Sequence, residues 1–311
     1  MRQSRLGVLA LAVILLVQGF FYLQVEGVLL PGFEAQSGNE KWSPEDELVE
    51  PSGAVAEKQV ISMEMDAARQ WKIRVVTYNI RHGEGLDGIL DLARIAAILR
   101  ELDPDVIALQ EVDNNFSPRS DWEDQAQVLA ELLDMEVAYG PALRSLLNLG
   151  RGPGYYGNAI LSKYPLQNVN NVVVEAPGLT ENRAFLHSEI TSPIGSFHFI
   201  STHLGLEHDH RLTHLTKMLA YVAELEGPVI VAGDFNSTST SLEVKAMFEA
   251  GLRDSAALLG RGLEPTLIGP KAARIDYVFT TADITVKDVA VVDADGSDHR
   301  PVVVDLTLPL L

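Results

Sequence analysis

Two kinds of predicted β-strand recur along this chain and restrict the folds open to it. Short runs such as Val106–Leu109 and Val229–Ala232 are wholly apolar, whereas Phe185–Thr191, Ser196–Thr202 and Val302–Leu308 alternate apolar and polar residues. A wholly apolar strand is typical of a sheet that is covered on both faces, and an alternating strand has one apolar face. Segments with apolar residues at helical spacing lie between the strands, and we find no internal repeat. The pattern predicts an α/β fold in which helices cover the outer faces of the sheets.

The same two periods locate the remaining elements. Helices are expected over residues 90–102, 125–133, 211–225 and 242–250. Further strands are expected over residues 73–80, 158–162, 169–174, 275–280 and 286–292. All of these elements lie within residues 71–311, which we expect to form one monomeric domain.

An apolar segment of 20 residues, Leu6–Val25, lies near the N-terminus and carries no charged side chain. This is about the length that crosses the hydrocarbon core of a bilayer. Arg2 and Arg5 precede it and acidic residues follow from Glu26, so the N-terminus is expected on the cytoplasmic side. Residues 1–25 are therefore predicted to be a single-pass signal anchor in the cell membrane, with the rest of the chain extracytoplasmic. The alternative is a signal peptide whose cleavage releases a secreted protein.

Acidic residues are abundant in both the segment that follows and the predicted domain. Residues 26–70 show no persistent period and contain several prolines and glycines, so we expect a flexible acidic linker. The whole chain has 43 acidic and 24 basic residues and a formal charge of −19. Because proteins that bind polyanions do so through Lys and Arg, this balance disfavours a broad nucleic-acid surface. The absence of cysteine excludes disulfides, thiolate catalysis and zinc–thiolate sites.

Polar residues recur where the predicted strands begin or end. They are Asn79, Gln110, Glu111, Thr202, His203, Asp234, Asn236, Asp276, Asp298 and His299. Their repetition predicts one convergent site. Carboxylate and amide oxygens are the ligands that Mg²⁺ or Mn²⁺ prefers, and histidines can share proton transfer, so the set suits metal-assisted attack on a phosphate. No serine or cysteine lies in a nucleophile elbow, and GEGLDG at residues 83–88 lacks the lysine of a phosphate-binding loop.

Seven motifs resemble, in order, those of the endonuclease/exonuclease/phosphatase superfamily, which includes the pancreatic deoxyribonuclease-like nucleases. They are TYNI (77–80), ALQEVD (108–113), GNAILSKYPL (157–166), STHL (201–204), VAGDFNS (231–237), RIDYVF (274–279) and SDHRPVVV (297–304). They span most of residues 71–311, with the short spacing of bacterial members. The resemblance implies a four-layer α/β sandwich in which two packed mixed β-sheets are flanked by helices.

The resemblance also implies roles for the metal and for the attacking water. Asn79 and Glu111 match metal ligands for Mg²⁺ or Mn²⁺, and Asp298 matches a residue near the metal. Asp234 matches the residue that orients or activates the attacking water. Asn236 matches the residue that holds the phosphate or a transition-state oxygen.

Further matches concern the scissile phosphate. His299 matches an imidazole that contacts this phosphate, and Asp276 matches the carboxylate that orients the imidazole. His203 resembles the second histidine of deoxyribonuclease-like members, a candidate to protonate or stabilise the leaving oxygen. Arg183 matches a basic phosphate contact, and Asn158 is a further candidate for phosphate binding.

These features predict a divalent-metal-dependent hydrolase that cleaves a phosphodiester or phosphomonoester by in-line attack of water. The predicted anchor and the acidic composition favour a lipid head group or a small phosphoester as substrate. One alternative is an anchored or secreted nuclease that acts on extracellular DNA or RNA. Another is an inactive, anchored interaction module. The histidines of LEHDHRLTH (206–214) are interpreted as a solvated helix start, with a histidine metal site as the alternative.

Overall fold

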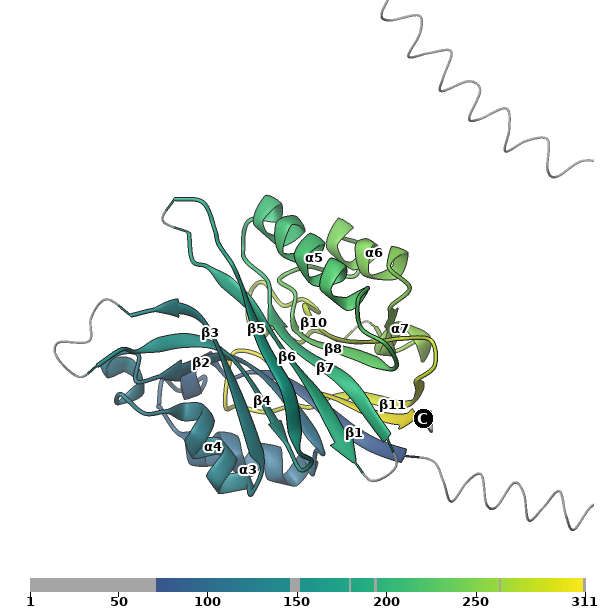
Figure 1. The fold of residues 1–311 in the computed structure, drawn as a ribbon. Helices are drawn as coiled ribbons and strands as arrows, with labels where there is room; N and C mark the ends of the chain where they lie inside the picture. The colour runs from purple at the N-terminus through teal and green to yellow at the C-terminus, as the bar shows by residue number, and fades with distance from the viewer. Residues whose placement is uncertain (1–70, 146–151, 179, 193–194, 263, 310–311) are drawn as a thin grey trace, which may run out of the picture. The chain divides into compact units, whose positions relative to one another are not determined.

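The computed structural model describes residues 71–145, 152–178, 180–192, 195–262 and 264–309, and these form two six-stranded β-sheets (Figure 1). In spatial order, the first sheet contains β11 (Thr285–Val291), β12 (Val302–Leu308), β1 (Trp71–Asn79), β2 (Val106–Asn114), β4 (Tyr155–Ser162) and β3 (Glu136–Arg144). The second contains β5 (Leu166–Val174), β6 (Arg183–Ser192), β7 (Gly195–His203), β8 (Val229–Asp234), β10 (Asp276–Thr280) and β9 (Arg253–Asp254). The pairs β1–β2 and β7–β8 are parallel and the other pairs are antiparallel, so both sheets are mixed.

Helices cover the outer face of each sheet. The first sheet packs against α3 (Leu92–Leu102) and α4 (Gln125–Leu133), and the second against α5 (His208–Val222) and α6 (Leu242–Glu249) (Figure 1). The short helix α7 (Ser255–Leu258) lies beside β9 and β10. Two 3₁₀ turns, η1 (Arg81–Gly83) and η2 (Pro118–Ser120), follow β1 and β2. This arrangement confirms the predicted four-layer sandwich.

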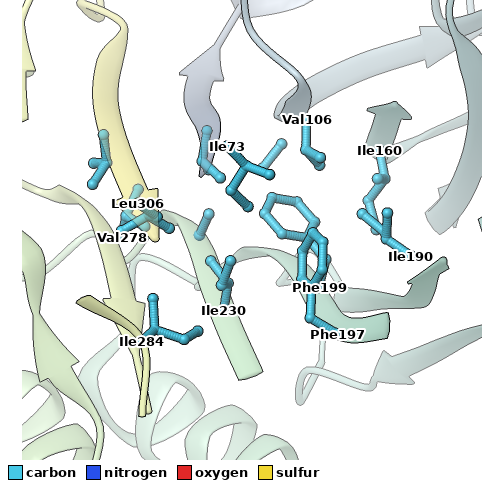
Figure 2. Packing of buried hydrophobic residues seen from close by; sticks show 14 of the residues in the cluster. Ile73, Val106, Ile160, Ile190, Phe197, Phe199, Ile230, Val278, Ile284 and Leu306 are labelled. Carbon is cyan, nitrogen blue, oxygen red and sulfur yellow. The ribbon is translucent and has the colours of Figure 1, made fainter. Parts of the chain in front are cut away.

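The largest apolar core lies between the two sheets. Figure 2 shows Ile73 and Val106 of the first sheet facing Phe199 and Ile230 of the second. Each of these side chains is at most 3% exposed. Burial of such aliphatic and aromatic area is worth about 25 cal/mol per Å², so this layer holds the sheets face to face. Their strand ends then meet along one edge of the sandwich.

Several elements differ from the sequence-based expectation. The strand β3 and the short elements β9 and α7 were not predicted, because their segments carry no clear period. The helix α5 begins at His208, and the interpretation of its histidines as solvated is wrong for two of them. His210 and His214 are 4% and 0% exposed, and His214 Nε2 lies 3.1 Å from Thr202 Oγ1. Among the described residues, these histidines do not form a cluster that could hold a metal.

The predicted membrane anchor and acidic linker, residues 1–70, lie outside the described residues. Within the part of the chain that the structure describes, no helix has the length and apolar character needed to cross a membrane.

Close approach of β7 and β8 depends on a glycine. In this parallel pair His203 is the partner of Asp234, and Thr202 is the partner of Gly233. A Cβ added at Gly233 would lie 1.9 Å from the carbonyl oxygen of Thr202. No side chain therefore fits at this position without separating the two strands that carry His203 and Asp234.

We predict that Gly233→Ala destabilises the domain by about 1–3 kcal/mol, because the added methyl group has to displace backbone rather than a flexible side chain. Urea unfolding measures this change. Gly262→Ala is the matched control, since its Cβ would make only an ordinary contact, 3.7 Å from Arg274. Equal midpoints for the two variants would contradict the prediction.

Candidate active site

The first sheet contributes Asn79 and Glu111 to one edge of the sandwich. Asn79 ends β1, and Glu111 lies in an irregular part of β2, where the register with β4 shifts between Leu109 and Val112. Glu111 has a φ of 58°, a conformation that costs a non-glycine residue about 1–2 kcal/mol. The bulge turns its carboxylate toward Asn79, whose Nδ2 donates to Glu111 Oε1 at 3.0 Å.

The second sheet contributes three strand ends to the same edge. Asp234 ends β8, with His203 as its partner on β7 and Asp276 as its partner on β10. Asn79 Nδ2 also donates to Asp234 Oδ2 at 3.0 Å, so one amide joins carboxylates from both sheets. The predicted convergence of these strand ends is therefore present in the structure.

His299 lies between two carboxylates. Its Nδ1 is 2.9 Å from Asp276 Oδ2, and its Nε2 is 3.7 Å from Asp234 Oδ2. The segment around it is held by backbone bonds from Ile268 N to Asp298 O and from Arg300 N to Thr266 O. Burial alone would lower the pKa of His299, but the Asp276 and Asp234 carboxylates outweigh it and raise this pKa to about 10. His299 is therefore an imidazolium at neutral pH.

Asp234 and His203 have the opposite protonation tendencies. Burial raises the pKa of Asp234 to about 7, and the Asp276 carboxylate opposite it acts in the same direction. Burial lowers the pKa of His203 well below its ordinary value, and the Arg183 cation adds to this effect. The site thus combines a carboxylate that can take up a proton near neutral pH with a neutral imidazole.

Asn236 is occupied by contacts within the protein. Its Nδ2 donates to Leu204 O at 2.9 Å and to His203 Nε2 at 3.2 Å, and its backbone N–H donates to Asp234 Oδ1 at 2.8 Å. These bonds position His203 and Asp234. Both amide hydrogens have acceptors within the protein, and the contact of Asn236 with a phosphate oxygen stays a prediction.

Two groups of side chains have ligand atoms that suit a cation. Ligand atoms of Asp234, Asp276 and His299 all lie within 4.8 Å of one another and form one candidate set. Glu111 and Asn79 form the other: Glu111 lines an open cleft, and the amide oxygen of Asn79 accepts from Arg81 N at 3.1 Å. These hard oxygen donors suit Mg²⁺ or Mn²⁺, which keeps water in its remaining positions.

The other predicted residues lie in different surroundings. The Asp298 side chain is 39% exposed, and its Oδ2 lies 3.8 Å from Arg81 Nε. Arg183 lines the cleft, and its Nη1 donates to Glu181 Oε2 at 2.8 Å. Asn158 is 1% exposed, and its Nδ2 donates to Ala184 O at 2.7 Å, so it joins β4 to β6.

A cleft of ≈ 320 Å³ opens beside the charged groups and contains residues that sequence reasoning missed. Its lining includes Phe116, Arg119, Leu143, Tyr156, Glu181 and Leu206. Phe116 and Arg119 follow β2 directly, and Tyr156 lies at the start of β4. Their position next to the strand ends that carry the predicted site was the available signal, because strand neighbours share one edge of a sheet.

The ion pair between His299 and Asp276 can be tested without metal. We predict that Asp276→Asn lowers the pKa of His299 from about 10 by at least one unit, because the amide removes the nearest negative charge that stabilises the imidazolium. Proton and nitrogen NMR of the ring across a pH series measures this pKa. Asp305→Asn, at the exposed Arg74–Asp305 pair, is the control. An unchanged pKa in Asp276→Asn would contradict the assignment.

Comparison with known proteins agrees with this geometry. The model of the endonuclease/exonuclease/phosphatase family matches residues 76–299. An uncharacterized Escherichia coli protein, YbhP, is 30% identical over 198 residues, which cover 60% of this chain and 76% of that protein. An endonuclease/exonuclease/phosphatase structure from Beutenbergia cavernae is 30% identical, with a TM-score of 0.66 over 76% of this chain and 72% of that one. A Bacteroides vulgatus structure shares the fold at 21% identity, with a TM-score of 0.64 over 77% of this chain and 100% of that one. The chain therefore belongs to the endonuclease/exonuclease/phosphatase family.

Proposed function

We propose that this protein is a divalent-metal-dependent phosphoesterase that hydrolyses a lipid head group or a small phosphoester. The observation that carries the proposal is the pair of hydrogen bonds from Asn79 to Glu111 and Asp234, which brings together acidic groups of both sheets beside the His299 imidazolium. A cationic imidazole and several carboxylates beside an open cleft suit a reaction in which water attacks an anionic centre.

Glu111 and Asn79 would hold the metal, and Asp298 is a further candidate ligand. When bound, the cation neutralises phosphate charge and polarises the phosphorus centre. Asp234 accepts the proton of the attacking water, since its pKa of about 7 lets it act as a base at neutral pH.

The imidazolium of His299 donates a hydrogen bond to a phosphoryl oxygen and stabilises the charge that develops there. Asp276 keeps this ring charged and oriented through Nδ1. Neutral His203, held by Asn236, lies beside Asp234, with Nε2 3.5 Å from Asp234 Oδ2. It can take up the proton that Asp234 removes from water and return it to the leaving oxygen, which balances the hydrolysis.

The charge of the chain supports a small or head-group substrate over duplex nucleic acid. The formal charge of −19 repels a long polyanion, and a phosphate backbone would need many cationic contacts. The cleft offers two arginines, Arg119 and Arg183, in its lining. Two local cations suit a ligand of a few charges.

We predict that the full-length protein hydrolyses bis-(p-nitrophenyl) phosphate with Mg²⁺ or Mn²⁺ and that EDTA abolishes this activity. Glu111→Gln and His299→Ala should each lower kcat/KM by about 10²–10³, because each removes a group that stabilises charge in the transition state. Glu131→Gln, on the exposed side of α4, is the matched control and should keep activity within about two-fold.

Equal hydrolysis by the wild type and both site variants would overturn the proposed site. Hydrolysis of plasmid DNA that exceeds that of phospholipids and small esters, and that falls steeply with added salt, would support the nuclease instead. Absence of metal-dependent hydrolysis on every phosphoester would leave the inactive interaction module.

We further propose that residues 1–25 anchor the protein in the cell membrane with the catalytic domain extracytoplasmic, on the charge and length of Leu6–Val25. The full-length protein should remain in the membrane pellet after an alkaline carbonate wash, and a chain without residues 1–25 should be soluble. Protease added to intact spheroplasts should degrade the domain. A soluble mature form that lacks these residues would instead support a cleaved signal peptide.

A further inference from the structure

We propose that Arg119 and Arg183, placed together on Tyr156, form a subsite for a second phosphate group of the substrate, apart from the phosphoester that is cleaved. The inference rests on the proposed phosphoesterase function and adds to it a substrate class: phosphoesters that carry a further phosphate. Both arginines line the same cleft as Glu111, Asp234 and His299.

Arg119 is held in place by Asp113, but one nitrogen of its guanidinium takes no part in that ion pair. Its Nε and Nη2 donate to the two carboxylate oxygens of Asp113 at 2.8 and 2.7 Å, and the Asp113 side chain is fully buried. Nη1 lies outside this ion pair, and the Arg119 side chain is 40% exposed. Because Asp113 holds the guanidinium plane, Arg119 loses little conformational freedom when it binds an anion.

Arg183 is almost enclosed and incompletely paired. It is 6% exposed, and among the described residues its buried Nε has no hydrogen-bond partner. Its ion-pair partner Glu181 has a side chain that is 62% exposed and can turn away into solvent. A buried guanidinium with an unused donor is costly unless a ligand satisfies it.

Both cations contact the ring of Tyr156, which lines the cleft with them. The Cζ atoms of Arg119 and Arg183 lie 5.5 and 5.8 Å from the centroid of the Tyr156 ring, and Arg119 also lies 4.6 Å from the Phe116 ring. Cation–π contacts hold each guanidinium against the aromatic surface. The cleft beside Tyr156 thus contains two guanidinium groups that can bind an anion.

The two arginines keep donors outside their ion pairs. The pairs use Arg119 Nε and Nη2 and Arg183 Nη1, whereas Arg119 Nη1 and, among the described residues, the buried Arg183 Nε lie outside them. Guanidinium donors suit the oxygens of a phosphate, so these nitrogens can bind a further phosphate group of the substrate.

The test compares two chromogenic diesters with the same leaving group: butyl 4-nitrophenyl phosphate and its analogue with a second phosphate at the end of the butyl chain. For the full-length wild type we expect kcat/KM about ten-fold higher with the second phosphate, the size of one charge-assisted hydrogen bond, mainly through KM. Arg119→Gln and Arg183→Gln should each reduce this ratio to below about three-fold. Arg100→Gln, on the exposed side of α3, removes the same charge away from the cleft and should keep the ratio.

The ratio of kcat/KM for the two diesters separates loss of phosphate recognition from misfolding. A misfolded site would lower the activity on both diesters and leave their ratio unchanged. Since Arg119→Gln leaves Asp113 buried without its partner, the double variant Asp113→Asn/Arg119→Gln repeats the test without an unpaired buried carboxylate. A wild-type ratio near one, or an unchanged ratio in the arginine variants, would overturn the subsite while hydrolysis of the butyl ester still supported the proposed function.

A binding measurement gives a readout that does not depend on turnover. By calorimetry, butane-1,4-diyl bisphosphate should bind the wild type about ten-fold more tightly than butyl phosphate, and Arg119→Gln should remove this difference. Equal affinities in the wild type would overturn the subsite. A difference that persists without any hydrolysis of phosphoesters would support the subsite and count against the proposed function.

Discussion

The amide of Asn79 lies where the two sheets meet, and its hydrogen bonds to Glu111 and Asp234 hold together the charged groups of the site. Each sheet alone would end in carboxylates that repel their neighbours and prefer water. The apolar layer that contains Ile73 and Phe199 brings the sheets face to face, and the strand ends are then forced into proximity. The Asn79 amide donates hydrogen bonds to the acidic groups at this point. The free energy gained by packing the core offsets the cost of holding several charges close together at the edge.

This concentration of charge explains several local irregularities. Glu111 adopts a left-handed conformation in a bulge, Asn236 does so at the end of β8, and Gly233 leaves room for the carbonyl of Thr202. Each irregularity lies within or beside a residue of the site. Strain of this kind persists because the regular sheets on either side determine the position of the backbone.

Much of the fold could be predicted from the sequence because apolar periods report which faces are buried. The strands around Val106 and Val229 and the helices on the outer faces follow from those periods, whereas β3 contains Gly140 and Pro141 and shows no clear alternation. The strand-end residues predicted the charged cluster for a similar reason: the parallel pairs β1–β2 and β7–β8 each end at one edge. The position of Arg119 and Tyr156 beside predicted strand ends was a signal for the site, but their contact with each other depends on how the loop after β2 approaches the start of β4, which no sequence period reveals. The sequence also does not show that Asn236 donates its amide hydrogens to His203 and Leu204.

The position of β12 has a consequence for how the protein is made. This strand, near the end of the chain, pairs with β1 in the interior of the first sheet, and His299 lies just before it. During synthesis, β1 lacks one neighbour until nearly the whole domain has been translated, and the ion pair of His299 with Asp276 cannot form earlier. Pairing between strands that lie far apart in the sequence slows folding. The charge cluster therefore cannot be complete before β12 has been synthesised and has paired with β1.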